Sequence, residues 1–255
     1  MADATKRRTA LITGAANGFG WATAQRLAKA GHDVILLDKA AEVQGRAETL
    51  KTQGAAAEAI TLDLADREAI SRMTDTVLKQ RGRIDILVNN AGMGLAGPTG
   101  APLPLEEVTL PKWDLVVAVN LTAPFLLSQA FSPGMKANKW GRIVNISSRA
   151  GRTAVAASDP SYAATKAGII GLTRLLALKL GPDGVTVNAI APGRFDTALA
   201  NVSSPEVMAH AMANIPVGRI GAPDEIAAAI AFLASEEAGY MTGAVLDING
   251  GAFIG

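Results

Sequence analysis

The sequence predicts an α/β fold, a doubly wound sheet of about seven parallel strands that forms a single domain over residues 1–255. Three observations support this prediction: short apolar runs, helical patterns between them, and a length that suits one large α/β domain. Units of this kind pair their strands in parallel and cover both faces of the sheet with helices. The expected strands lie at residues 10–13, 33–38, 57–63, 84–90, 142–147, 185–190 and 244–248.

The first strand run is followed by a glycine cluster, TGAANGFG, and then by a helical pattern from Phe19 to Ala30. The glycines therefore lie on a strand-to-helix turn, where free N–H groups and the helix dipole suit a pyrophosphate. We expect Gly14, Gly18 and Gly20 to allow the tight turn, the approach of the phosphates and the packing of helix on strand. The spacing differs from the common G-x-G-x-x-G pattern, and a turn without a ligand is the alternative.

Asp38 ends the second run, where a carboxylate can accept hydrogen bonds from an adenosine ribose. The same charge would repel the extra phosphate of NADP by roughly 1 to 3 kcal/mol after screening. We therefore expect NAD to be preferred over NADP. Lys39 is the alternative determinant, because its ammonium could neutralise that phosphate, whereas Asn17 offers no compensating cation.

The composition excludes several classes of function. The chain has no cysteine and only two histidines, which excludes disulfides, thiol nucleophiles and a histidine-rich zinc site, and we expect no metal. A net charge of +1 with scattered basic residues predicts no nucleic-acid surface. We find no apolar stretch near the ~20 residues of a membrane span and no secretion signal, so we expect a cytoplasmic protein with no membrane partner.

The sequence DPSYAATKAG predicts a helix start, with Ser158 or Asp159 as the cap and Pro160 in the first turn. Tyr162 and Lys166 then share one helix face. An ammonium close to a phenol lowers the pKa of the phenol from about 10, which would make Tyr162 a general acid and base. An ordinary surface pair at this common spacing is the alternative.

Other polar residues follow the expected strands. Ser147 and Ser148 end the fifth run, where a hydroxyl could donate to a carbonyl oxygen. The segment NNAG, residues 89–92, ends the fourth run and could turn the backbone beside a cofactor. Asn120 lies inside a long helical pattern, where asparagine is slightly unfavourable. Long segments rich in Gly, Pro or polar residues, at 91–114, 149–160 and 192–223, predict functional loops or lids.

Together these residues resemble the short-chain dehydrogenase/reductase family in its single-domain form, including members similar to 3-oxoacyl-ACP reductases. The resemblance runs from TGAANGFG through NNAG, Asn120, Ser148, the Tyr162–Lys166 pair and PGRFDT to YMTGAVLDINGG, nearly the whole chain. It implies a Rossmann-type fold, a nicotinamide cofactor and hydride exchange between an alcohol and a carbonyl. It also implies a homo-oligomer, a tetramer or a dimer.

The same resemblance implies a role for each site residue. Tyr162 would donate or accept the proton, Ser148 would hold the substrate oxygen, and Asn120 would anchor a water in a proton relay. Lys166 would bind the nicotinamide ribose and lower the pKa of Tyr162. The implied cofactor-binding residues are Gly14, Asn17, Gly18, Phe19, Gly20, Asp38, Lys39, Asp63, Leu64, Asn90, Ala91, Gly92, Tyr162, Lys166, Pro192, Gly193, Phe195 and Thr197.

Some features leave alternatives open. Phe19 stands where the family usually carries Ile, and the loop after NNAG is longer than usual, so the sequence does not define the carbonyl or alcohol substrate. Arg149, Arg152 and Arg194 could bind a carboxylate or phosphate of a substrate, or could face solvent or a partner subunit. A sugar epimerase or dehydratase, and a cofactor-sensing protein without catalysis, are the other functions considered.

Overall fold

The computed structural model describes residues 6–97, 103–196 and 212–255. In this part of the chain, seven strands form one sheet in the order β3-β2-β1-β4-β5-β6-β7, and every pair is parallel. The strands are β1 (Thr9–Thr13), β2 (Asp33–Asp38), β3 (Ala57–Thr61), β4 (Ile86–Asn89), β5 (Gly141–Ile146), β6 (Val185–Pro192) and β7 (Val245–Ile248). The predicted doubly wound, Rossmann-type α/β fold is confirmed.

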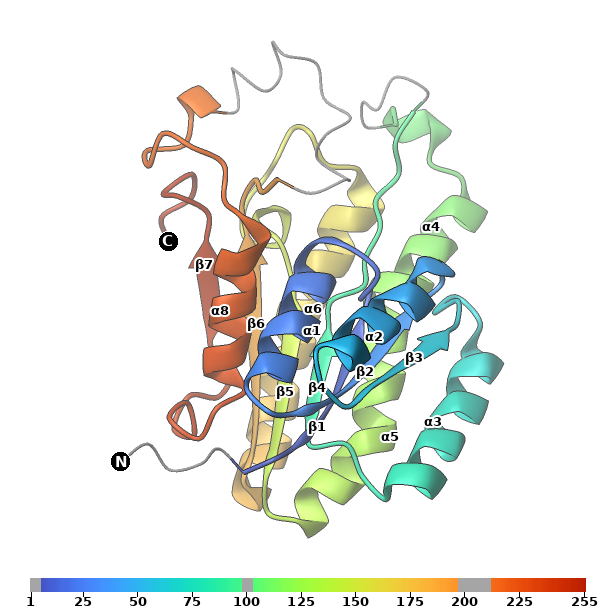
Figure 1. Cartoon of the computed structure of the whole chain (residues 1–255). Coiled ribbons are helices and arrows are strands. Elements are labelled where there is room, and N and C mark those ends of the chain that lie inside the picture. The colour runs from blue at the N-terminus through green and yellow to red at the C-terminus, as the bar shows by residue number, and fades with distance from the viewer. Residues whose placement is uncertain (1–5, 98–102, 197–211) are drawn as a thin grey trace.

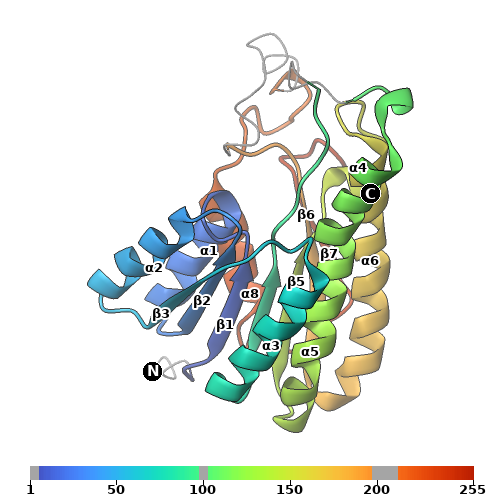
Figure 2. The same cartoon turned by 90° about the vertical axis from the view of Figure 1, so that its right-hand side faces the viewer.

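Helices cover both faces of this sheet (Figures 1 and 2). One face carries α1 (Gly18–Lys29), α2 (Glu42–Thr52) and α8 (Pro223–Leu233), and the other carries α3 (Arg67–Arg81), α5 (Ala123–Ala137) and α6 (Pro160–Leu180). Short helical segments lie between these elements: η1 (Leu105–Glu107), η3 (Arg149–Gly151) and η4 (Gly181–Asp183).

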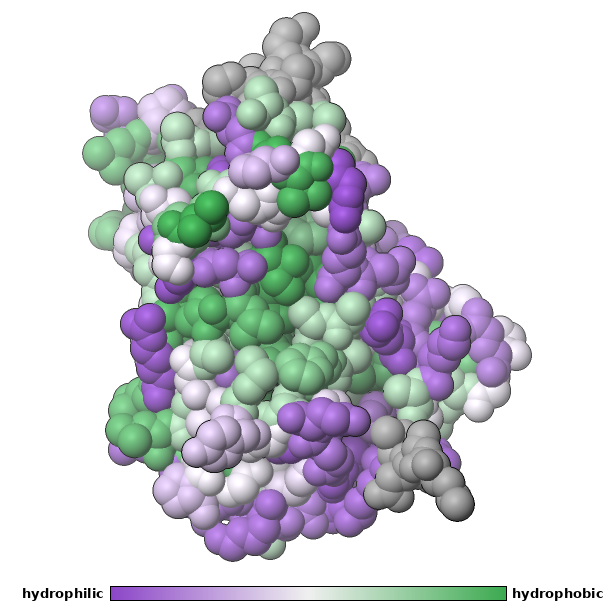
Figure 3. Space-filling view, turned by 90° about the vertical axis from the view of Figure 1, so that its left-hand side faces the viewer, coloured by the Kyte–Doolittle hydropathy of each residue, from purple (hydrophilic) through white to green (hydrophobic). Residues whose placement is uncertain are grey.

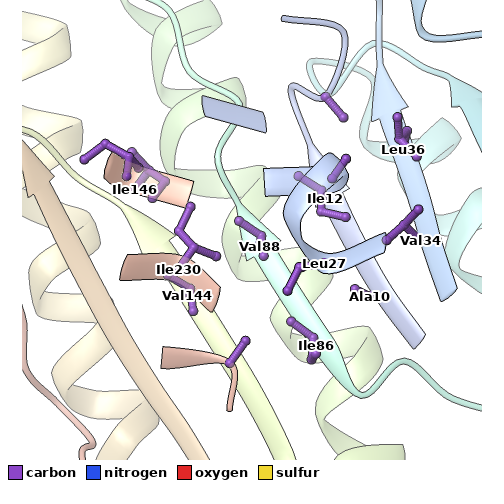
Figure 4. Packing of buried hydrophobic residues seen from close by; sticks show 14 of the residues in the cluster. Ala10, Ile12, Leu27, Val34, Leu36, Ile86, Val88, Val144, Ile146 and Ile230 are labelled. Carbon is purple, nitrogen blue, oxygen red and sulfur yellow. The ribbon is translucent and has the colours of Figure 1, made fainter. Parts of the chain in front are cut away.

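The inner strands of the sheet are buried on both faces, and alternate residues enter different cores, whereas the edge strands β3 and β7 are only partly buried. Ile12 on β1 belongs to the same core cluster as Leu27 of α1 and Ile230 of α8, and all three are labelled in Figure 4. The neighbouring Leu11 faces the opposite side and joins the cluster that contains Phe131 of α5. This two-sided burial explains why the strands read as continuous apolar runs in the sequence.

A long continuous helix, Leu110–Ala137, contains α4 (Leu110–Val117), a π-turn η2 (Ala118–Thr122) and α5. It begins inside the segment predicted to be a loop up to residue 114, with Pro111 in its first turn. Contrary to expectation, it is long and apolar enough to cross a membrane, the one such helix among the described residues. However, its fully buried Leu127, Phe131 and Met135 pack in the core beneath the sheet. The helix is therefore partly buried in the core, with 39% of its most apolar window buried.

The strand order reverses between β1 and β4, because β2 follows β1 on one side and β4 adjoins it on the other. Open α/β sheets bind ligands outside the carboxyl ends of the strands at this kind of position. The loops that leave β1, β4 and β5 therefore determine the candidate site.

Candidate active site

The glycine turn after β1 has the geometry of a phosphate cradle. Gly14 and Gly18 have positive φ angles of 67° and 53°, which side chains rarely tolerate. A Cβ atom on Gly20 would lie 2.1 Å from the carbonyl oxygen of Gly14, so α1 can approach the turn only with glycine there. The helix begins at Gly18, and its N-terminal N–H groups lie at this turn. These residues fit a bound pyrophosphate.

The segment after β4 is tied to the same turn. The hydroxyl of Thr13 accepts from the backbone N–H groups of Asn90 and Ala91, each at 3.0 Å. The Nδ2 group of Asn90 donates to the carbonyl oxygens of Thr13 and Gly14, at 2.8 and 3.1 Å. A Cβ on Gly14 would lie 2.9 Å from the Cα of Ala91. The structure thus brings the two predicted backbone segments into contact at the strand reversal.

Asp38 lies at the end of β2 beside the glycine turn. Its Oδ2 accepts from the N–H of Ala16 and its Oδ1 from the N–H of Ala40, both at 3.0 Å. These bonds hold the carboxylate at the outer side of the turn, where the adenosine ribose of a dinucleotide would lie. The neighbouring Lys39 is exposed.

Arg46, which no motif in the sequence indicates, adds a positive charge at this place. From α2, its Nε donates to the carbonyl oxygen of Ala16 at 2.9 Å and its Nη2 to the Oδ1 of Asn17 at 3.3 Å. Its guanidinium lies 4.8 Å from the ring centre of Trp21. Asn17 itself offers no cation, as expected, but Arg46 places one beside it. No local signal reveals the contact, because Arg46 reaches the turn only through the packing of α2.

Tyr162 lies in the first turn of α6, facing the end of β5. Ser148 forms a side-chain hydrogen bond with it, and the Ser148 hydroxyl also accepts from the N–H of Ala150 at 3.1 Å. The other candidate hydroxyl, Ser147, donates instead to the carbonyl oxygen of Lys166 at 2.6 Å. Ser148 is thus the one of the two serines that reaches the phenol.

Lys166 lies one turn after Tyr162 and is 3% exposed. Its Nζ donates to the carbonyl oxygen of Ile146 at 2.8 Å and lies 5.5 Å from the ring centre of Tyr162. A Cβ on Gly92 would lie 3.0 Å from the same nitrogen. The predicted pairing of Tyr162 and Lys166 on one helix face is thus present, and the segment after β4 passes directly over it.

The electrostatics differ from the sequence prediction. Burial raises the pKa of Tyr162, the hydrogen bond with Ser148 lowers it, and the charge of Asp159 raises it, so that the net shift is upward. Lys166 is not among these causes, and burial lowers its own pKa to about 8. The sequence predicts a lowered pKa for Tyr162, and this direction is corrected, because burial disfavours the phenolate and is the largest cause of the shift.

Asn120 lies in the π-turn, where the regular helix is interrupted. Its Oδ1 accepts from the N–H of Met93 at 2.9 Å, and its Nδ2 donates to the carbonyl oxygen of Met93 at 2.8 Å and to the hydroxyl of Thr165 at 3.1 Å. The side chain therefore fixes the loop after β4 to α6. An unfavourable asparagine in a helical pattern indicated this site.

The remaining predicted cofactor residues lie at two other places. Asp63 forms a local turn by accepting from the N–H of Ala65 at 2.9 Å, and the side chain of Leu64 packs into the core. Phe195 meets Phe19 edge to face, with 5.1 Å between the ring centres. This contact brings the end of β6 at Pro192, and the segment that follows from Gly193, against the glycine turn. Thr197 lies outside the described residues.

The arginines after β5 have protein partners. Arg152 donates twice to the carboxylate of Asp247, at 3.2 and 2.9 Å, and lies over the ring of Phe253. Arg149 donates to the carbonyl oxygen of Ala252 at 3.3 Å. These contacts favour a structural role for both side chains over substrate binding. The third arginine, Arg194, follows β6, and its backbone oxygen accepts a hydrogen bond from the N–H of Gly221.

The described residues contain no group of His, Cys, Asp and Glu side chains that could hold a metal ion.

Comparisons with known proteins place the chain in a family. Residues 14–252 match the family model described as Enoyl-(Acyl carrier protein) reductase. The 3-oxoacyl-[acyl-carrier-protein] reductase of Aquifex aeolicus is 40% identical over 248 residues, 96% of this chain and 97% of that protein. The chain belongs to the short-chain dehydrogenase/reductase family. It is an NAD(P)-dependent oxidoreductase that acts on carbonyl or alcohol substrates.

Two solved structures resemble the whole fold with a TM-score of 0.90 and 38% identity. One, described as an NAD(P)-dependent gluconate 5-dehydrogenase from Beutenbergia cavernae with NADP at low occupancy, matches over 98% of each chain. The other, a 3-oxoacyl-[acyl-carrier protein] reductase from Brucella melitensis with bound NAD, matches over 99% of this chain and 94% of that one. The two structures thus differ in the substrate that their descriptions name and in the cofactor that is bound.

Proposed function

We propose that the protein transfers a hydride between a nicotinamide cofactor, preferably NAD, and a secondary alcohol or ketone, with Tyr162 as general acid and base. The observation that carries this proposal is the convergence of Ser148, Tyr162 and Lys166 beneath the segment that follows β4. The glycine turn supports the cofactor, because Gly14 and Gly20 leave no space that a Cβ atom could fill, Gly18 has a positive φ, and the turn presents N–H groups to a pyrophosphate.

In the direction of reduction, the buried phenol of Tyr162 is neutral and can give its proton to the carbonyl oxygen. The bound nicotinamide supplies the hydride. Ser148 holds the substrate oxygen through its hydroxyl beside the phenol. Lys166, whose pKa of about 8 leaves it mostly protonated at neutral pH, can return a proton toward Tyr162. Asn120 fixes the loop over this pair and would anchor a water molecule in a proton relay.

The preference for NAD is supported by Asp38, whose carboxylate lies beside the turn at the expected ribose position. Its charge would oppose a 2′-phosphate. The exposed Lys39 and the guanidinium of Arg46 act in the opposite direction, because either cation attracts that phosphate. The preference therefore depends on the balance between Asp38 and these two cations.

We also propose a homo-oligomer, a dimer or a tetramer, located in the cytoplasm and without nucleic-acid or membrane partners. Apolar residues gather on the face of β7 and α8 (Figure 3), and Phe232 on α8 is 46% exposed. On α6, Leu178 is 76% exposed. Light scattering should give a mass above that of one chain, and Leu178→Asp or Phe232→Asp should lower it. A monomeric wild-type protein would contradict the assembly proposal.

The test of the reaction is turnover of NADH with a panel of ketones that includes a 3-oxoacyl thioester, a keto sugar acid and small neutral ketones. We expect oxidation of NADH with at least one ketone and the reverse reaction with its alcohol. An epimerase or a dehydratase would convert sugar substrates without net oxidation of NADH. A cofactor-sensing protein would bind NADH without turnover of any substrate. Either result would contradict the proposal.

A further inference from the structure

Asp159 makes contacts with two separate parts of the chain, although it is only 3% exposed. As the N-cap residue of α6, it accepts through Oδ1 from the N–H of Tyr162 at 3.0 Å and from the hydroxyl of Ser161. Through Oδ2 it accepts from the N–H of Leu95 at 2.8 Å, in the loop after β4. A helix cap needs only one side-chain oxygen. The second oxygen therefore carries a long-range contact that capping does not explain.

The loop that Asp159 reaches lies against the reactive side chains. Asn120 binds both backbone groups of Met93, and Asp159 binds Leu95, so the loop is held on either side of Gly94. A Cβ on Gly94 would lie 3.0 Å from the Oδ2 of Asp159 and 3.4 Å from Cδ2 of Tyr162. A shift of this loop therefore changes the space beside the phenol ring.

We propose that Asp159 is a positioning residue, which joins the backbone of Leu95 to the first turn of α6 and thereby fixes the Tyr162 phenol relative to Ser148 and the loop after β4. This inference rests on the proposed acid–base role of Tyr162. A fixed phenol matters because proton transfer requires hydrogen-bond distance to the substrate oxygen, and small misplacements of reacting groups cost large factors in rate.

The charge of Asp159 adds an electrostatic effect that can be measured. It raises the pKa of Tyr162, in the same direction as burial and against the hydrogen bond with Ser148. From α6, the other charged group near the ring is Lys166. The loop after β4 brings only uncharged residues from Gly92 to Leu95, and the turn after β5 brings Ser148, followed by Arg149 with its bond to Ala252. Removal of the Asp159 charge should therefore act on Tyr162 directly.

Asp159→Asn separates these effects from helix capping. Asparagine caps helices about as well as aspartate. Its amide, however, has only one acceptor oxygen. When this oxygen accepts from the N–H of Tyr162, the NH₂ group faces the N–H of Leu95, and two donors cannot form a hydrogen bond. The variant thus keeps the cap and loses both the charge and the bond to the loop. Asp66→Asn is the matched control, because Asp66 caps α3 by accepting from the N–H of Ala69 at 2.9 Å.

The first measurement is the ultraviolet titration of the phenol in protein without ligands. The chain has two tyrosines, so the Tyr240→Phe background leaves Tyr162 as the only phenol. We expect Asp159→Asn to move the ionisation midpoint to lower pH and Asp66→Asn to leave it unchanged, with circular dichroism confirming the fold at each pH. An unchanged midpoint in the folded Asp159→Asn variant would overturn the electrostatic part of the inference.

The second measurement is kinetic. Asp159→Asn should lower kcat by about tenfold or more while KM for the cofactor changes less than about twofold. The rising limb of the pH profile for alcohol oxidation should move to lower pH. Gly94→Ala is a second variant, which keeps the cap and the charge but pushes the loop against Asp159 and Tyr162. It should also lower kcat, and it keeps the test valid if Asp159→Asn does not fold.

The outcomes separate this inference from the proposed function. Wild-type kcat in both Asp159→Asn and Gly94→Ala would show that Asp159 is a helix cap alone and overturn the positioning role. A lowered titration midpoint in a protein that turns over no ketone would support the action of Asp159 on Tyr162 and contradict the proposed reaction instead.

Discussion

The ammonium nitrogen of Lys166 lies 5.5 Å from the ring centre of Tyr162, one turn further along α6. The same nitrogen donates to the carbonyl oxygen of Ile146, at the end of β5. Lys166 thus connects the edge of the sheet with the phenol. Burial opposes its positive charge and lowers its pKa to about 8.

This lowered pKa predicts a pH-dependent contribution to stability. Between about pH 8 and pH 10 the unfolded chain binds more protons at Lys166 than the folded chain, so stability should rise with pH. Relative to Lys166→Met, the free energy of unfolding of the wild type should increase by about 1 kcal/mol for each pH unit in this window. Below pH 8 the difference should be constant, because both states are protonated.

Urea unfolding at several pH values measures this difference, and Lys179→Met on the exposed side of α6 is the matched control. Lys166→Met should also weaken cofactor binding and reduce turnover, since the ammonium is proposed to bind the ribose as well as to act near the phenol. A pH-independent difference in stability between Lys166→Met and the wild type would show that Lys166 titrates as an exposed lysine.

The cofactor preference should change when the charges beside the glycine turn change. Asp38→Ser should improve binding of NADP relative to NAD by about ten- to a hundredfold, because it removes a repulsion of roughly 1 to 3 kcal/mol. In the Asp38→Ser background, Arg46→Ala should remove part of the gained affinity for NADP. The guanidinium of Arg46 lies beside Ala16 and Asn17, where it would attract the 2′-phosphate. Calorimetric Kd values for both cofactors measure the ratio.

Arg26→Ala is the control for this series, because Arg26 is exposed in the last turn of α1. It should leave the ratio of the two Kd values unchanged. A wild-type protein that binds NADP more tightly than NAD would show that Lys39 or Arg46 outweighs Asp38.

Arg152 should contribute to stability and not to recognition of an acidic substrate. Arg152→Ala leaves the carboxylate of Asp247 half-buried without its bidentate partner, which should cost about 1 to 3 kcal/mol of unfolding free energy. Asp247→Asn should cost a similar amount, and the double variant should cost less than the sum. A large rise in KM for an acidic substrate, absent for its neutral analogue, would instead assign Arg152 to the substrate.

The strands could be predicted from the sequence because a parallel sheet covered on both faces consists of apolar runs. The predicted run 33–38 coincides with β2 (Asp33–Asp38). The run 57–63 extends past β3, which ends at Thr61, because Asp63 already forms a turn with Ala65. The helix start, with a cap at Ser158 or Asp159, and the shared face of Tyr162 and Lys166 could also be predicted, since both depend on residues close in sequence, and the structure has the cap at Asp159. That residues 1–255 form one domain remains a prediction.

The rest of the site depends on contacts between distant parts of the chain. Arg46 reaches the glycine turn across 30 residues, and Leu95 reaches Asp159 across 64. The sequence carries no periodicity or motif for such contacts. The predicted direction of the pKa shift at Tyr162 is wrong for a related reason. Helical spacing indicates that Lys166 is near, but only the packed structure shows that burial is the largest cause of the shift at Tyr162.

The most direct test of the account is the oxidation of NADH by the wild type, Tyr162→Phe and Tyr240→Phe with the best ketone of the panel. Tyr240 is the other tyrosine of the chain and is fully exposed, so it is the matched control. We predict that Tyr162→Phe lowers kcat by about 10² to 10⁴, because the proton donor is lost. Its Kd for the cofactor should remain within about twofold, since the ring still packs, and Tyr240→Phe should match the wild type. Turnover by Tyr162→Phe within about twofold of the wild type would contradict the assignment of Tyr162 as the general acid and base.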